Sequence, residues 1–259
     1  MSKIIIKPQK KQFIEHINKE VVISTQETIF VTNENKDFST KHGIIKKEEF
    51  TKPDGSIVTS STGTAFILLT PTFIDHYQRI KRLPQTIPLK DIGWIIAKTG
   101  IGTESIAVDA GCGSGALALT LARHAKHVIT YDLEEEHLSI AKQNATMLGI
   151  TNITFKIGDA TKHIDEHNVD IVTLDLPNPW EAIQMASLAL RIGGFLVSYS
   201  PTIPQTIDFV NSIFSRKEFI IIEVVEIIER PWEVTGRKVR PISKETIHSG
   251  FLTLARKIT

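Results

Sequence analysis

The sequence lacks long apolar runs, contains very little cysteine and has almost no net charge. No stretch of the 259 residues reaches about 18 consecutive apolar residues, so we expect no membrane-spanning helix. Cys112 is the only cysteine, which excludes an intramolecular disulfide and fits a protein of the reducing cytoplasm. With 30 Lys and Arg against 29 Asp and Glu, any polyanionic partner would have to be held by local basic patches.

The composition is that of a globular protein, and the pattern of apolar and turn-forming residues changes along the chain. Residues 1–72 contain short β-branched or apolar runs at 21–23, 28–31, 56–59 and 66–69, separated by turn residues. This spacing predicts a small β-rich domain, a barrel or a sandwich. We expect a second domain over residues 73–259, which includes a connecting helix near 73–81.

Strands alternate with helices from residue 105 onward. Strands are expected at 106–108, 128–131, 153–157, 169–174 and 195–197, and helices at 115–124, 134–148, 180–190 and 206–214. Two more strands are expected near 219–228 and 250–256. This alternation predicts a parallel sheet covered on both faces, with a ligand site beyond the carboxyl ends of its strands.

A glycine-rich loop, V-D-A-G-C-G-S-G at positions 108–115, joins the first of these strands to a helix. Glycines allow a sharp turn and a close ligand, and the helix start offers free N–H groups to an anion. In an S-adenosylmethionine site that anion is the methionine carboxylate. Asp132, at the end of the next strand, can accept hydrogen bonds from the ribose hydroxyls, and Asp159, one strand later, can meet the adenine amino group.

The loop by itself leaves other interpretations open. Gly111, Gly113 and Ala116 also fit the relaxed dinucleotide fingerprint, and a purely structural tight turn is a further alternative. Asp109 before the loop, the third glycine at position 115 and Asp159 favour S-adenosylmethionine over a nicotinamide cofactor. We interpret Cys112 as a small loop residue rather than a nucleophile.

The fourth strand of this series runs into the motif D-L-P-N-P-W at positions 175–180. A carboxylate that leaves a buried strand lies beside the ligand crevice, and two prolines stiffen the turn that follows. Asp175 and Trp180 together suggest a slot for a flat base with an acceptor at its edge. The alternative is that Asp175 caps the next helix and Trp180 fills the core.

Several further blocks complete a resemblance to a known family. They are T-K-H-G-I-I at 40–45, G-S-I-V-T-S-S-T-G at 55–63, Arg82, K-D-I-G at 90–93, Y-S-P-T at 199–202 with Gln205, E-R-P-W at 229–232, R-P at 240–241 and H-S-G-F-L at 248–252. With the glycine loop and the 175–180 motif, they resemble the tRNA adenine-N1 methyltransferases that act on position 58 of the T-loop. The archaeal and bacterial homo-oligomeric members are the most similar, over nearly the whole chain.

The resemblance implies an α/β fold, a Rossmann-like S-adenosylmethionine-dependent methyltransferase sheet with a small N-terminal all-β domain. It implies methyl transfer to N1 of adenine 58, with a neighbouring adenine as a further candidate, and a cytoplasmic homotetramer that binds tRNA. Asp175 is the implied catalytic residue, and no metal is expected. Cofactor positions are Asp109, Gly111, Gly113, Ser114, Gly115, Ala116, Leu117, Asp132, Leu133, His137, Asp159, Ala160 and Asp175, and substrate positions are Pro177, Trp180, Tyr199, Arg230 and His248.

Three positions depart from the family pattern, and two other functions stay open. Asn178 stands where the family has an acidic residue, Ser249 where it has threonine, and Pro88 where it has a tyrosine. One alternative is a methyltransferase for proteins or small molecules on the same sheet. The other is a non-catalytic tRNA-binding subunit, which would be expected to have lost its glycine loop or Asp175. His163 and His167 have a possible metal spacing but no evident third ligand.

Overall fold

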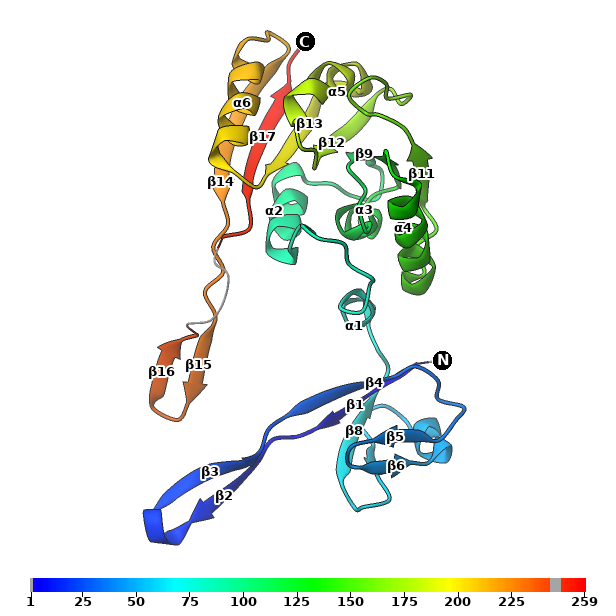
Figure 1. Cartoon of the computed structure of the whole chain (residues 1–259), viewed down its shortest axis with the longest axis vertical. Coiled ribbons are helices and arrows are strands. Elements are labelled where there is room, and N and C mark those ends of the chain that lie inside the picture. Colours follow the sequence, from blue (N-terminus) through cyan, green and yellow to red (C-terminus); the bar gives the residue numbers. More distant parts are fainter. Residues whose placement is uncertain (1, 243–247) are drawn as a thin grey trace. The chain divides into compact units, whose positions relative to one another are not determined.

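The computed structural model describes residues 2–242 and 248–259 and separates the chain into two compact units (Figure 1). The first unit is Met1–Arg79 and the second is Ile80–Thr259. Helix α1 (Phe73–Tyr77), which the sequence analysis grouped with the second domain, falls in the first unit. No helix among the described residues is long and apolar enough to cross a membrane.

The N-terminal unit is built on a four-stranded antiparallel sheet. Its strands are β1 (Lys3–Lys7), β4 (Glu27–Val31), β7 (Ile57–Thr59) and β8 (Ala65–Leu69), in the order β4-β1-β8-β7. The hairpin of β5 (Phe38–Thr40) and β6 (Gly43–Ile45) and the 3-10 helix η2 (Lys47–Thr51) add Ile45 and Phe50 to the sheet's core. Because β4 and β7 are free edges of this sheet, it does not close into a barrel.

A second hairpin in this unit stands apart from that core. It consists of β2 (Lys10–Ile14) and β3 (Lys19–Ser24), joined by the 3-10 helix η1 (Glu15–Ile17). Phe13, Ile17 and Ile23 of the hairpin are exposed. None of its strands or turns contributes to the buried core of the four-stranded sheet.

The second unit contains a seven-stranded sheet in the order β11-β10-β9-β12-β13-β17-β14. The strands are β9 (Ile106–Ala110), β10 (His127–Asp132), β11 (Ile153–Ile157), β12 (Val169–Leu174), β13 (Leu190–Ser200), β14 (Phe219–Glu226) and β17 (Phe251–Lys257). The expected parallel pairing holds from β11 to β13, whereas β17 is antiparallel to both of its neighbours and makes the sheet mixed. Between β14 and β17 the described chain forms a hairpin, β15 (Trp232–Thr235) and β16 (Lys238–Pro241), instead of a crossover helix.

Helices cover both faces of this sheet (Figure 1). They are α2 (Leu89–Thr99), α3 (Ala116–Ala122), α4 (Glu135–Leu148), α5 (Ile183–Ala189) and α6 (Ile203–Phe214), with the 3-10 helix η3 (Pro179–Ala182) before α5. Successive strand residues point to opposite faces, so Val108 packs in the core beneath α5 and α6, whereas Ala107 packs beneath α2 and α3. Both faces of β9 are therefore buried.

The connectivity of the sheet fixes where a ligand can bind. From β9 the chain proceeds to β10 and β11 on one side, and then returns to β12 on the other side of β9. In doubly wound sheets such a reversal opens a crevice outside the carboxyl ends of the strands. The glycine loop, Asp132 and Asp175 follow β9, β10 and β12 at that edge.

Candidate active site

The glycine loop is held against the strands on either side of it. The N–H groups of Gly111 and Cys112 both donate to the Tyr131 carbonyl at 3.0 Å, and the Asp175 N–H donates to the Ala110 carbonyl at 2.8 Å. Gly111 has φ +94°, and a Cβ on it would lie 2.0 Å from the backbone oxygen of Asp175. Only glycine permits this approach, which brings the loop and the carboxyl end of β12 together.

Asp132 is the hydrogen-bonding centre on the β10 side of the loop. Its Oδ2 accepts a hydrogen bond from the Gly113 N–H at 2.8 Å, and its Oδ1 accepts one from the Glu134 N–H at 3.0 Å. Oδ1 also lies 3.2 Å from Nδ1 of His137 on α4. The carboxylate therefore fixes the loop's conformation and is itself held at the edge of the crevice.

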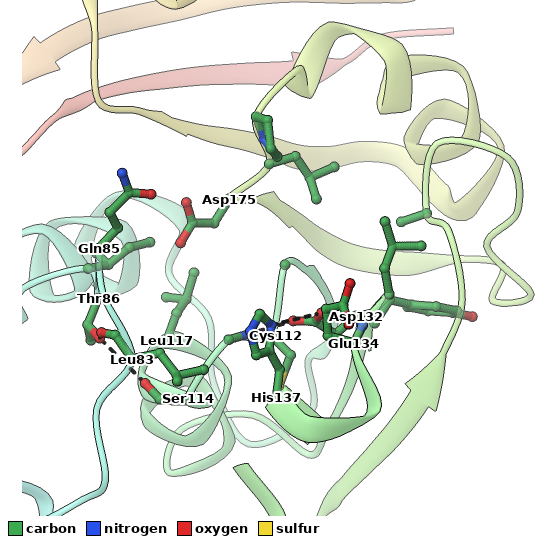
Figure 2. Close-up of a pocket in the computed structure, with 18 of the residues that line it drawn as sticks. Leu83, Gln85, Thr86, Cys112, Ser114, Leu117, Asp132, Glu134, His137 and Asp175 are labelled. Carbon is green, nitrogen blue, oxygen red and sulfur yellow. Dashed lines mark hydrogen bonds and ion pairs between the residues drawn. The ribbon is translucent and has the colours of Figure 1, made fainter. Parts of the chain in front are cut away.

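A cavity of about 460 Å³ lies over this loop (Figure 2). It brings together most of the cofactor positions expected from the sequence: Gly111, Gly113, Ser114, Ala116, Leu117, Asp132, Leu133, His137, Asp159, Ala160 and Asp175, with Pro177 beside them. Figure 2 shows Asp175 on the side of Gln85, and Asp132, Glu134 and His137 at the other end.

One wall of this cavity, the segment 83–87, was not predicted from the sequence. Asn144 of α4 holds this wall, since its Nδ2 donates to the carbonyl oxygens of Lys81 and Ser114 and its Oδ1 accepts from the Lys81 N–H. A loop positioned by a side chain 63 residues away has no local sequence signal. Only the prolines at 84 and 88 marked the segment as irregular.

Two expected cofactor residues, Asp109 and Gly115, do not line the cavity. Asp109 is fully buried and accepts hydrogen bonds from the hydroxyl groups of Thr130 at 2.7 Å and Thr173 at 2.8 Å. Burial raises its pKa to about 6 despite these bonds. Asp109 is thus a buried structural residue of the strand that leads into the loop. Gly115 is the N-cap residue of α3 and adopts φ +82° there.

Asp159 lies in the cavity wall with both of its carboxylate oxygens engaged. Oδ2 pairs with Lys162 at 2.8 Å, and Oδ1 accepts hydrogen bonds from the Thr161 hydroxyl at 2.6 Å and the Thr161 N–H at 3.0 Å. The Lys162 and Thr161 bonds lower the pKa of Asp159 to about 2. Its charge is therefore permanent at neutral pH.

Burial raises the pKa of the Cys112 thiol far above its usual range, with the charge of Asp109 adding to the effect. The thiol therefore stays protonated at neutral pH, and only a thiolate is a strong nucleophile. Cys112 lines the cavity at the turn of the loop, as expected for a small loop residue.

A second cavity, of about 410 Å³, adjoins the first at Asp175. It is lined by Gln85, Thr86, Pro88, Leu89, Lys90, Asp175, Tyr199, Pro201, Glu229, His248 and Ser249. Asp175, Gln85 and Thr86 line both cavities. Of the five substrate positions expected from the sequence, the structure brings Tyr199 and His248 to this cavity.

The Asp175 carboxylate is partly buried and faces this junction (Figure 2). Burial raises its pKa to about 8, and the nearby charges of Asp109 and Asp132 act in the same direction. No described residue donates a hydrogen bond to it. The carboxylate caps no helix, because η3 begins at Pro179 with Asn178 at its N-cap. An unpartnered acceptor between two cavities is placed to meet a ligand.

A buried ionic network frames the second cavity. The Lys90 ammonium donates to Asp91 Oδ1 at 2.9 Å, to the Ile227 carbonyl at 2.5 Å and to the Ser249 hydroxyl oxygen at 2.5 Å. The Ser249 hydroxyl in turn donates to Oδ2 of Asp91, which is completely buried. These bonds join the first turn of α2 to the segments that follow β14 and precede β17.

Tyr199 and His248 complete that wall. The Tyr199 hydroxyl donates to the Ser249 carbonyl at 2.7 Å, and burial raises the pKa of Tyr199 to about 12, so the phenol is neutral. His248 Nδ1 lies 2.6 Å from Glu226, and its Nε2 lies 3.0 Å from the Pro201 carbonyl oxygen. Both partners are acceptors, and the bond to Glu226 raises the pKa of His248, which favours the doubly protonated ring.

Two expected substrate residues line neither of these cavities. Trp180 is partly buried and packs against the hydrophobic core beneath α5 and α6. Arg230 is exposed, with its guanidinium 5.6 Å from the ring centre of Trp232. No cluster suited to a metal occurs among the described residues, and His163 pairs with Asp165.

The chemistry of the first cavity fits S-adenosylmethionine better than a dinucleotide. Its charged lining consists of Asp132, Glu134, Asp159, Asp175 and Glu181, and His137 is the one potentially basic side chain among its described lining residues. A pyrophosphate would meet repulsion from these carboxylates, whereas a sulfonium cation would be attracted. Leu117 and Leu133 supply apolar surface for a purine ring.

Comparisons with known proteins agree with this geometry. The family model described as the tRNA methyltransferase complex GCD14 subunit matches residues 66–249. The tRNA (adenine(57)-N(1)/adenine(58)-N(1))-methyltransferase TrmI of Methanocaldococcus jannaschii is 34% identical over 249 residues, which cover 85% of this chain and 87% of that protein. The tRNA (adenine(58)-N(1))-methyltransferase TrmI of Thermus thermophilus is 29% identical, over 78% of this chain and 81% of the relative.

Solved structures match both units of the chain. A SAM-dependent O-methyltransferase from Thermotoga maritima has a TM-score of 0.82 and 28% identity, over 99% of this chain and 93% of its own. The tRNA (m1A58) methyltransferase TrmI from Aquifex aeolicus has a TM-score of 0.78 at 23% identity, over 99% and 97%, a likeness of fold. With the family match and the archaeal relative, this chain belongs to the tRNA methyltransferase complex GCD14 subunit family.

Proposed function

We propose that this protein transfers a methyl group from S-adenosylmethionine to N1 of adenine 58 in the T-loop of tRNA. The observation that carries the proposal is the position of Asp175, whose unpartnered carboxylate lines both the donor cavity and the second cavity. One residue can therefore act where a methyl donor and an acceptor base meet. The relatives in Methanocaldococcus jannaschii and Thermus thermophilus are named for this reaction.

The donor cavity is assigned to S-adenosylmethionine, which when bound supplies an electrophilic methyl group on a positively charged sulfur. Ser114, at the loop before α3, offers a backbone N–H to the methionine carboxylate. Asp132 accepts hydrogen bonds from the ribose hydroxyls, and Asp159 faces the adenine end. Leu117, Leu133 and Ala160 provide the apolar surface against the purine.

The second cavity is assigned to the target adenine. N1 of a paired base is inaccessible, so the nucleotide has to be extruded into this cavity before it can react. Asp175 accepts a hydrogen bond from the exocyclic N6 amino group. As N1 gains a methyl group, positive charge spreads to N6 and strengthens this bond, which stabilises the transition state more than the ground state.

Tyr199, Lys90 and Ser249 line the second cavity with Asp175, and His248, whose pKa is raised by its bond to Glu226, adds a group there that is positively charged when protonated. The phosphates of tRNA attract such charges, so binding should weaken with salt. A non-catalytic tRNA-binding role is disfavoured, because the loop geometry and the Asp175 carboxylate are both intact.

Mass spectrometry of nucleosides tests the reaction directly. Unmodified tRNA incubated with the protein and S-adenosylmethionine should gain one N1-methyladenosine, and fragment mapping should place it at position 58. A matched tRNA with guanine at position 58 should stay unmodified, or reveal methylation of a neighbouring adenine. Methylation of neither tRNA, with donor binding intact, would contradict the proposed substrate.

We also propose that the protein acts as a homotetramer in the cytoplasm. The oligomeric state rests on the resemblance to homo-oligomeric family members. Exposed apolar residues on β14, at the edge of the seven-stranded sheet, support it. They are Ile220, Ile222 and Val224, which stand at or on either side of a β-bulge.

A further inference from the structure

The donor cavity is lined by several acidic side chains. Five carboxylates, those of Asp132, Glu134, Asp159, Asp175 and Glu181, line it, and no Lys or Arg occurs among the described lining residues. A ligand of net positive charge at this place is stabilised, and a neutral one of the same shape is not. The cavity is therefore suited to distinguish the sulfonium donor from the uncharged thioether that remains after transfer.

Asp175 differs from the other four carboxylates in having no compensating partner. Asp132 accepts hydrogen bonds from two backbone N–H groups, and Asp159 pairs with Lys162. Glu181 accepts from the Asn178 amide at 3.1 Å, and Glu134 is exposed to solvent. Asp175 is partly buried, and its carboxylate makes no hydrogen bond to a described residue.

The groups around Asp175 come from several elements of the second unit. They are Asp109 on β9, Cys112 in the loop, Asp132 at the end of β10, Glu181 on η3, Tyr199 on β13, Lys90 and Asp91 on α2, and Glu229 and His248 beside the second cavity. The basic groups that line these cavities with Asp175 lie beside other carboxylates: Lys90 beside Asp91, His248 beside Glu226 and His137 beside Asp132. Burial is the main cause that disfavours a charge on Asp175, and the carboxylates Asp109 and Asp132 act in the same direction.

We propose that Asp175 carries a proton in the free enzyme and releases it to solvent when the cationic donor binds, so that the cavity selects the donor over its neutral product. This inference rests on the proposed placement of the donor beside Asp175. The O–H bond of the carboxylic acid breaks, the proton passes to water, and the resulting carboxylate faces the sulfonium. Once transfer has removed the sulfonium charge, the carboxylate is left opposite the newly cationic adenine.

Calorimetric titration at pH 7 measures this proton directly. Heats of S-adenosylmethionine binding in phosphate and in Tris, whose ionisation enthalpies differ, give the number of protons exchanged. With the pKa of Asp175 near 8 in the free enzyme, donor binding should release about 0.9 proton. S-adenosylhomocysteine should release about none, because it brings no charge to the sulfur.

Two variants assign the proton to its residue. Asp175→Asn should abolish the proton release and reduce the preference for donor over product by about tenfold or more. Glu181→Gln, which removes another lining carboxylate, should release the proton as the wild type does. Release of less than about 0.2 proton by the wild type, or undiminished release by Asp175→Asn, would overturn the proposal.

The pH dependence of affinity supplies a second readout. Below pH 8, wild-type affinity for the donor should rise about tenfold per pH unit relative to Asp175→Asn, and affinity for the product should not. The comparison with the variant cancels the titration of the donor's own amino group, since that group is common to both measurements. Parallel profiles for the two proteins would contradict the inference, even if tRNA methylation were confirmed. Failure of the donor to bind at all would instead contradict the proposed function.

Discussion

At the scale of single residues, the reaction depends most on the charge that Asp175 can present to the adenine. Asp175→Asn keeps the size and one acceptor oxygen but removes the negative charge. Turnover should fall about 100-fold or more, the range seen when one well-placed electrostatic group is lost. Single-turnover methylation of tRNA measures this. Glu181→Gln is the matched control and should lose far less, and near-wild-type turnover by Asp175→Asn would remove Asp175 from the catalytic role.

The same substitution should change how stability depends on pH. The pKa of Asp175 is raised from 3.8 to about 8 by burial and by neighbouring carboxylates. A group whose folded-state pKa is raised stabilises the protein below its unfolded pKa, and that stabilisation is lost as pH rises through the folded value. The melting temperature of Asp175→Asn, relative to wild type, should therefore rise between about pH 4 and pH 8. A constant difference in thermal melts across this range would show that the carboxyl titrates normally.

Strand-end carboxylates were predictable from sequence because a parallel sheet brings them to one edge. Asp132 ends its strand, Asp159 and Asp175 follow theirs, and all three line the donor cavity. The orientation of Trp180 was not predictable, because its motif does not show which side of η3 meets the core. The alternative interpretation, in which Trp180 packs in the core, describes its position.

At the scale of elements, the contact between the glycine loop and the end of β12 is the closest in the site. In Gly111→Ala the new Cβ would stand 2.0 Å from the Asp175 backbone oxygen, so the loop or the strand end must move. Donor affinity should fall at least about tenfold, since the amides that bind the anion shift with the loop. Calorimetric titration with S-adenosylmethionine measures the change.

Gly113→Ala is the matched control for this loop. Gly113 also has a positive φ, +52°, but nothing lies within 4 Å of its Cβ position. This variant should show only the strain of a left-handed residue, about 1 kcal/mol of stability. Because Gly113 lines the donor cavity, the comparison is made on stability: equal losses in thermal melts of both variants would indicate that conformational strain, rather than the contact with Asp175, makes glycine necessary.

The Lys90–Asp91–Ser249 network should matter for both stability and substrate binding. Ser249→Ala removes one partner from a buried carboxylate and one from the lysine, and should lower the free energy of unfolding by about 2 kcal/mol. KM for tRNA should rise as well, because these bonds hold the wall of the second cavity. Ser249→Thr keeps the hydroxyl and should restore both values. Denaturant unfolding and steady-state kinetics measure them, and a Thr variant as impaired as Ala would contradict the hydrogen-bonding role.

The bounds of elements with a regular apolar pattern were predicted accurately. Elements that are defined by contacts with distant residues were not predicted. Strands β11 and β12 match the predicted ranges because they are apolar runs bounded by turn residues. Helix α2 was missed because prolines at 84 and 88 precede it and Gly93 interrupts it, although Ile92 and Ile95 are fully buried. The antiparallel direction of β17 depends on the β15–β16 hairpin before it. This hairpin was not predicted, because its strands are short and polar.

At the scale of the whole molecule, the near-zero net charge conceals a division of charge within the active site. The donor cavity has no Lys or Arg among its described lining residues, whereas the second cavity adds Lys90 and His248, which pair with Asp91 and Glu226, to its own carboxylates Asp175 and Glu229. Such a division suits a cationic donor on one side and a polyanionic substrate on the other. Composition alone could not predict it, because the charges are brought together by strands and loops from across the sheet.

The assembly of the protein can be tested at the edge of the seven-stranded sheet. Strand β14 is the outermost strand, and its residues Ile220, Ile222 and Val224 are 43–47% exposed in the single chain. Exposed apolar side chains on an edge strand favour aggregation unless another subunit covers them. Light scattering of the wild type should therefore give the mass of a tetramer, and Ile222→Lys should shift it to smaller species with an unchanged circular dichroism spectrum. Leu188→Lys, on α5, replaces an equally apolar residue that is 61% exposed and should leave the mass unchanged. A wild-type monomer that methylates tRNA would refute the homotetramer, and dissociation by Leu188→Lys alone would place the interface on the α5 side of the sheet.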